Sequence, residues 1–271
     1  ISMSKGSVSN IKYQKWIAIA SAALLFCIIY FGFSLTDKNK KSKLDKERAL
    51  ITEVTGPETL VKEARASASK DTLELVGRLE HLTEGTDTAL IVENLKRLSG
   101  VWYSQKRYGM AGYYAQQVAT IEGSAQAWSI AGTTYGVGVR ALPEGKEREF
   151  CVGRAVKAFE NAISLDPKET NHRVNLATIY AESPPKDNPM KGIMMLLDMS
   201  KSEPENITVM NTLGELAIKT GQWDKAITRL EKSYQLDPKN RETPCLLSMA
   251  YEGAGQHEKA HEIAKLCNQK G

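Results

Sequence analysis

Apolar residues recur every three or four positions along most of this chain, which is the spacing of one face of an α-helix. The segment from Asp71 to Leu82 shows the pattern, with apolar residues at Leu73, Val76, Leu79 and Leu82. No run alternates polar and β-branched residues as a half-buried strand would. The hydrophobic pattern therefore predicts an all-α protein.

One segment departs from this amphipathic pattern because it is apolar on every side. Trp16 to Leu35 spans twenty residues without a charge, enough at about 1.5 Å per residue to cross a hydrocarbon layer of about 30 Å. We interpret the segment as a transmembrane helix. A cleaved signal peptide is the alternative, although the apolar run is longer than such peptides carry and no small-residue cleavage site follows it.

The residues around this segment suggest an order of parts along the chain. A short tail (1–15) precedes the predicted span, and a charged, apolar-poor linker (36–56) and two N-terminal capping helices (57–91) follow it. More Lys and Arg follow the span than precede it, which places the remaining residues in the cytoplasm. The prediction is a single-pass protein of a bacterial inner membrane, with the outward-facing orientation left open.

The remaining residues divide into five similar segments, each expected to form a helical hairpin. Their bounds are 92–124, 125–169, 170–206, 207–240 and 241–271, with longer inter-helix loops near Pro143 and Pro184. Two positions of every segment hold only small residues. They are Ser99, Gly132, Ala177, Gly214 and Ser248 in the first helices, and Ala111, Ala155, Gly192, Ala226 and Ala260 in the second. Because closely packed helices tolerate only small side chains where they cross, we expect the crossings at these positions.

The fourth segment carries the clearest motif, formed by Leu213, Gly214, Gly221, Trp223, Ala226, Leu230 and Pro238. These residues stand at the spacing of the tetratricopeptide repeat, which this chain resembles over all five segments. The resemblance implies a right-handed superhelical solenoid with Trp223 in its core. It also implies a groove lined by the first helix of each repeat that binds proteins or peptides. The fold hosts many unrelated partners, so it does not identify one.

The groove implied by this resemblance supplies the candidate binding residues. They are Lys96, Arg97, Tyr103, Asn171, Asn175, Thr178, Asn211 and Glu215. Asparagine side chains carry both a donor and an acceptor, which suits an extended peptide backbone. The alternative interpretation is that these are ordinary solvated positions, and in that case the loops near Pro143 and Pro184 become the better candidates.

One catalytic pattern is present, because residues from His257 to His261 read HExxH. On a helix this spacing places two zinc ligands on one face with a glutamate as general base. The pattern falls at the start of a repeat helix, needs Ala260 at a crossing and has no downstream Glu or His as third ligand. We interpret it as a coincidence and expect no metal, no cofactor and no catalysis.

Charge and side-chain chemistry narrow the picture further. From Ala49 onward acidic residues slightly outnumber basic ones, which argues against nucleic acid as a partner. Outside the predicted span the cysteines number three, which is not typical of a disulfide framework and favours a reducing compartment. The methionines at 190, 194, 195 and 199 are interpreted as core filler.

The leading hypothesis is thus a membrane-tethered, non-catalytic scaffold or adaptor that binds other proteins or peptides in a membrane-associated complex. The runner-up is a peptide-binding, chaperone-like module for membrane or translocating clients. A zinc metallopeptidase built on the HExxH pattern is the remote third hypothesis.

Overall fold

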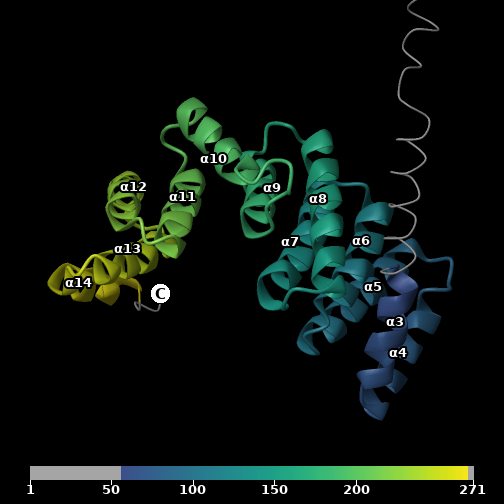
Figure 1. Cartoon of the computed structure of the whole chain (residues 1–271). Helices are drawn as coiled ribbons and strands as arrows, with labels where there is room; N and C mark the ends of the chain where they lie inside the picture. The colour runs from purple at the N-terminus through teal and green to yellow at the C-terminus, as the bar shows by residue number, and fades with distance from the viewer. Residues whose placement is uncertain (1–55, 268–271) are drawn as a thin grey trace, which may run out of the picture. The chain divides into compact units, whose positions relative to one another are not determined.

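Residues 56–267 are described by a computed structural model, in which this part of the chain is an all-α helical solenoid of twelve helices without a strand (Figure 1). The helices are α3 (Pro57–Ser67), α4 (Lys70–Leu82), α5 (Thr88–Ser104), α6 (Tyr108–Glu122), α7 (Ala125–Ala141), α8 (Lys146–Leu165), α9 (Thr170–Glu182), α10 (Lys191–Ser202), α11 (Ile207–Lys219), α12 (Trp223–Leu236), α13 (Glu242–Gly253) and α14 (His257–Cys267). The predicted all-α fold is confirmed for these residues, whereas the handedness of the solenoid and the division into repeats stay predictions.

The predicted single-pass membrane localisation is corrected by this structure. Between residues 56 and 267, none of the helices combines the length and the apolar character needed to cross a bilayer. The longest, α8, has 20 residues but carries charges along most of its length, and a charge in hydrocarbon is costly. The segment Trp16–Leu35, to which the span was assigned, lies outside the described residues, as do the tail and most of the linker.

Consecutive helices pack against one another as hairpins, and side-chain caps fix where several of them begin. The hairpins are α5 with α6, α7 with α8, α9 with α10, α11 with α12 and α13 with α14. The side chains of Asp87, Ser124 and Asn206 accept backbone N–H groups in the first turns of α5, α7 and α11. Such caps satisfy donors that a helix end leaves unpaired.

The hairpins cross where the small residues predict. The hydroxyl of Ser99 donates to the carbonyl of Ala111 at 2.8 Å, and the hydroxyl of Ser248 donates to the carbonyl of Ala260 at 3.1 Å. In the third hairpin, a Cβ atom on Gly192 would lie 2.4 Å from the carbonyl oxygen of Ala177. No side chain fits at that distance, so glycine is required for α9 and α10 to approach this closely.

Large side chains fill the space beside these crossings, but Trp223 is not among the buried ones. Trp102, Tyr135 and Phe159 are at most 2% exposed and belong to one cluster that extends from α3 to α9. Trp223 is only half-buried, and its ring lies over Gly253, where an added Cβ would meet ring carbons at 2.5 Å. The prediction of Trp223 as a buried core residue is wrong, because this side chain, at the first position of α12, stays partly exposed.

The methionines are also only partly core. Met199 is buried, whereas Met190 and Met194 are each 54% exposed. The interpretation as core filler is therefore wrong for these two residues. Met190 is the N-cap residue of α10 and Met194 lies within that helix, and no neighbouring helix covers either side chain.

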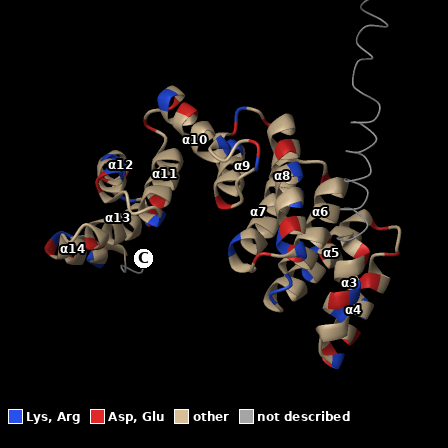
Figure 2. Ribbon diagram, in the orientation of Figure 1, with Lys and Arg blue, Asp and Glu red and all other residues tan. Residues whose placement is uncertain are grey.

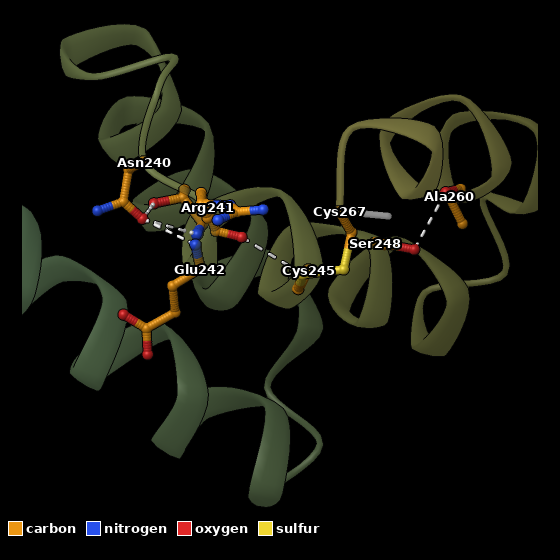
Figure 3. Close-up of a disulfide and its surroundings, with 8 residues drawn as sticks. Asn240, Arg241, Glu242, Cys245, Ser248, Ala260 and Cys267 are labelled. Carbon is orange, nitrogen blue, oxygen red and sulfur yellow. Dashed lines mark hydrogen bonds between the residues drawn. A yellow bond between two sulfur atoms is a disulfide. The ribbon is translucent and has the colours of Figure 1, made fainter. Parts of the chain in front are cut away.

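A disulfide joins Cys245 near the start of α13 to Cys267 at the end of α14, with Cα atoms 4.9 Å apart (Figure 3). The expectation of unpaired thiols is wrong for these two residues. Because α13 and α14 form an antiparallel hairpin, the start of the first helix lies beside the end of the second. The sequence separation of 22 residues between the two cysteines does not by itself reveal this proximity. Cys151 is a free, buried cysteine in the described part, and burial raises the pKa of its thiol to about 12.

Candidate peptide-binding groove

A hollow of about 360 Å³ opens between α5, α6 and α7. Its lining is mostly apolar, and it consists of Lys96, Ser99, Gly100, Tyr103, Ala115, Val118, Glu122, Ala127, Ile130 and Thr134. We call this set the α5–α7 hollow. It lies between the first helices of two successive hairpins, which is where the sequence analysis places the groove. Its volume is within the range of pockets that hold small ligands or a few side chains.

Two exposed apolar side chains frame the α5–α7 hollow. Tyr103 is 47% exposed and Ile130 is 53% exposed. The ring of Tyr103 is held edge-on against Tyr108, with ring centroids 5.4 Å apart. A half-exposed aromatic ring held in place by its neighbour offers contact area to a partner at low entropic cost.

A glycine leaves the space inside the hollow open. No atom comes within 4 Å of a Cβ built on Gly100, although this residue sits in the middle of α5. A glycine in a helix interior costs about 0.5–1 kcal/mol relative to alanine. Since no packing contact or backbone conformation requires Gly100, its effect is to leave room in the α5–α7 hollow.

One ion pair forms the polar rim. The ammonium group of Lys96 lies 2.6 Å from a carboxylate oxygen of Glu122, and both side chains retain contact with solvent. Such an exposed pair contributes little to stability. It leaves two ammonium hydrogens and both carboxylate oxygens with capacity for further hydrogen bonds at the edge of an apolar surface.

The structure places the other predicted groove residues elsewhere. Arg97 is exposed on α5 but does not line the α5–α7 hollow. Asn171 is exposed at the start of α9, and Asn175 is half-buried one turn later. The Thr178 hydroxyl donates to the carbonyl of Val174. The carboxylate of Glu215 on α11 pairs with Lys219 at 3.1 Å. Lys96 and Tyr103 are thus the two predicted residues that share one concave site.

Asn211 is not a groove residue, which corrects its assignment. It is 2% exposed, and its amide donates to the Thr243 hydroxyl at 2.9 Å while its carbonyl oxygen accepts from Ser233 at 2.7 Å. The side chain therefore joins α11, α12 and α13 through a buried polar network. A buried amide needs such partners, and here the helices themselves supply them.

The HExxH residues lie on α14, where the ring of His257 is 2.9 Å from the carboxylate of Glu252. His257 and His261 both line an open depression beside Trp223. Within residues 56–267, no three His, Cys, Asp or Glu side chains are grouped so that they could hold a metal ion. The two histidines therefore lack a third ligand in the described part of the chain.

Sequence reasoning missed the half of the α5–α7 hollow that α6 and α7 provide. Ile130 and Ala127 come from α7, and Val118 and Glu122 come from α6. The sequence did contain a signal for Ile130. It lies two positions before Gly132, the small residue at the crossing with α8, and residues two apart on a helix face different sides, so Ile130 turns away from that crossing. Gly100, next to the crossing residue Ser99, was the second available signal.

Comparison with known families bears on one of the helical hairpins. Residues 207–240 match the family described as "Tetratricopeptide repeat". This segment of the chain is thus similar to a tetratricopeptide repeat. It comprises α11 and α12, and its bounds are those of the fourth predicted segment. A comparison with curated protein sequences gives no match.

This chain is similar to a number of solved structures, of which three are described below. The crystal structure of MamA protein shares 17% identity over 65% of this chain and 89% of that one, with a TM-score of 0.39. TTC0263, a thermophilic TPR protein in Thermus thermophilus, shares 16% identity over 65% of this chain and 89% of its own, with a TM-score of 0.48. YrrB, described as a TPR protein with an unusual peptide-binding site, shares 15% identity over 64% of this chain and 83% of its own, with a TM-score of 0.36. At these identities and TM-scores, the likenesses carry no functional argument.

Proposed function

We propose that this protein is a non-catalytic interaction module that binds a segment of another protein in the α5–α7 hollow. The observation that carries the proposal is the hollow itself, an apolar depression framed by the exposed side chains of Tyr103 and Ile130. The tetratricopeptide repeat at residues 207–240 supports the same class of function. The partner segment would place apolar side chains over Gly100 and hydrogen-bond to the Lys96–Glu122 rim.

Stability gives no reason for this surface to be apolar, which favours a binding role. Burying Ile130 and Tyr103 against a partner would remove apolar area from water at about 25 cal/mol per Å². Neither side chain has that gain in the free protein, because each remains about half exposed. A contiguous exposed apolar surface with a polar rim is the usual form of a protein interaction site.

Filling the hollow tests the proposal without loosening the fold. Gly100→Leu would project a side chain into the open space, and Gly77→Leu in α4 is the matched control, since both glycines are helical with no atom within 4 Å of an added Cβ. Both changes should stabilise their helices by up to about 1 kcal/mol. We expect peptides selected from a displayed library on the full chain to lose affinity for Gly100→Leu and to keep it for Gly77→Leu.

The outcome separates the hypotheses. Equal binding to both variants would contradict the α5–α7 hollow as the binding site. If the hollow is the site, one dominant sequence motif among the selected peptides supports a scaffold with a dedicated partner. Many unrelated apolar sequences would instead support the chaperone-like module.

A further inference from the structure

A second cleft, of about 530 Å³, opens between α10 and α12 over α11. These are the second helices of two successive hairpins, whereas the α5–α7 hollow lies between first helices. The apolar part of its lining includes Met190, Ile193 and Leu197 on the α10 side and Leu213 and Leu216 from α11. We call it the α10–α12 cleft.

The apolar wall of this cleft is open to solvent. Met190 is 54% exposed and Leu197 is 36% exposed, and Met194 beside them is 54% exposed. Flexible methionine side chains adapt to different apolar partners and are common at protein-binding surfaces. The exposed methionines of α10 therefore suggest a surface that a partner covers.

The opposite wall is basic. Lys219, Lys225 and Arg229 line the cleft together with the acidic residue Glu182. The ammonium group of Lys219 contacts the carboxylates of both Glu182 and Glu215, so its positive charge is already compensated within the protein. Lys225 and Arg229, on α12, are the cations left over; the basic residues of α12 are blue in Figure 2.

Arg229 is the more unusual of the two cations. It is half-buried, and within residues 56–267 its guanidinium makes no hydrogen bond or ion pair, whereas Lys225 donates to Gln222 at 2.7 Å. Burial lowers the pKa of Arg229 from its ordinary value. A partly desolvated guanidinium without a counter-ion is unfavourable, and a carboxylate arriving from outside would accept two parallel hydrogen bonds.

The spacing of the two cations suggests the form of the partner. Lys225 and Arg229 are four residues apart on α12, so their side chains lie on one face with Cβ atoms about 5–6 Å apart. Acidic side chains four residues apart on another helix have the same spacing. An amphipathic helix places its apolar residues beside such a pair, as helices docked in apolar grooves do.

We propose that the α10–α12 cleft docks an acidic amphipathic helix of a partner protein. Its apolar side chains lie against Met190, Ile193 and Leu197, and its carboxylates pair with Arg229 and Lys225. This surface is separate from the α5–α7 hollow, so the protein holds two different segments at once and can bring two partners together.

The test uses the full chain to select from a displayed library of helical peptides, followed by binding measurements with the Arg229→Met variant. Methionine keeps an apolar side chain of similar length and removes only the charge. The matched control is Arg78→Met on α4, where Arg78 is exposed and makes only a long ion pair to Glu74. We expect a class of selected peptides that combines Leu-type residues at helical spacing with paired Asp or Glu, and that binds Arg229→Met about tenfold more weakly than the parent and Arg78→Met.

Replacing the paired acids of such a peptide by Gln one at a time should identify one acid whose removal weakens binding to the parent but causes no further loss on Arg229→Met. A second variant, Leu197→Glu, should abolish binding, with circular dichroism showing that helicity is kept. The proposal is overturned if no acidic class is selected, or if Arg229→Met and Arg78→Met bind the acidic peptides alike. It is also overturned if the parent forms concentration-dependent dimers that Arg229→Met loses, because a second copy would then occupy the cleft.

Discussion

The helices on either side of α9 are stabilised in different ways. From α3 to α9, one continuous cluster surrounds Trp102, Tyr135 and Phe159. From α11 to α14, the main cluster contains Leu230, Leu247 and Tyr251 among smaller residues such as alanine, and the terminal hairpin is closed by the Cys245–Cys267 disulfide. The two regions therefore draw on different sources of stability, which are large buried rings in α3–α9 and smaller buried side chains with a covalent cross-link in α11–α14.

The largest expected effect concerns the two tryptophans. Trp102→Ala should cost about 3–5 kcal/mol, because a fully buried ring is lost and leaves a cavity. Trp223→Ala should cost clearly less, since that side chain is already partly exposed to water. Denaturant unfolding followed by circular dichroism measures both. Equal losses would contradict the difference in burial between the two regions.

Removing the disulfide should have the next largest effect. The chain-entropy account assigns roughly 3 kcal/mol to a cross-link that closes a loop of this length, and the separation here is 22 residues. Cys245→Ser with Cys267→Ser should therefore unfold α13 and α14 at lower denaturant concentration while the α3–α9 cluster unfolds as before. The control is to repeat the comparison in the presence of a reductant, where the parent and the double variant should unfold alike. A single transition shifted as a whole would show that the two regions are not separable.

The buried amide of Asn211 gives a smaller, local prediction. Asn211→Ala leaves the hydroxyls of Ser233 and Thr243 without their shared partner, at a cost of about 1–3 kcal/mol. Asn175→Ala, at a half-buried position on α9, should stay within about 0.5 kcal/mol of the parent. Thermal or denaturant midpoints distinguish the two variants, and a neutral Asn211→Ala would restore that residue as a candidate for partner binding.

The smallest expected effect is a pH dependence at the junction of α9, α10 and α11. Hydrogen bonds from Thr170 and Asn206, together with Arg173, lower the pKa of Glu203 from its ordinary value of 4.5. A lowered folded pKa means that the stabilisation is present above about pH 4.5 and is lost as the pH falls through the folded value. Glu203→Gln should therefore weaken the fold at neutral pH and flatten its acid limb. Glu205→Gln, an exposed neighbour, should leave the pH profile of the free energy of unfolding unchanged.

The sequence predicted the helical class and the hairpin crossings because both depend on local spacing. Small residues at paired positions, such as Ser99 with Ala111, determine how closely two consecutive helices approach. In this hairpin the two residues are only 12 positions apart, so the crossing can be recognised within a short stretch of sequence. The resemblance to the repeat family singled out Lys96 and Tyr103 as groove candidates, and both line the α5–α7 hollow.

The rest depended on which helices meet at longer range. Asn211 has the position of a groove residue within its own hairpin, but Thr243 of the next hairpin covers it. Trp223 fits the repeat motif and is still partly exposed. The pairing of Cys245 with Cys267 and the isolation of Arg229 likewise depend on neighbours that local periodicity does not specify.

The most direct test of the proposed function is photo-crosslinking from the α5–α7 hollow. A photoreactive phenylalanine analogue replaces Tyr103 in one preparation of the full chain and Arg78, outside the hollow, in another. Each preparation is exposed to light with the peptides selected on the parent protein. Our account predicts crosslinked peptide from position 103, displaced by unlabelled peptide, and none above background from position 78. Equal yields at the two positions would contradict binding in the hollow.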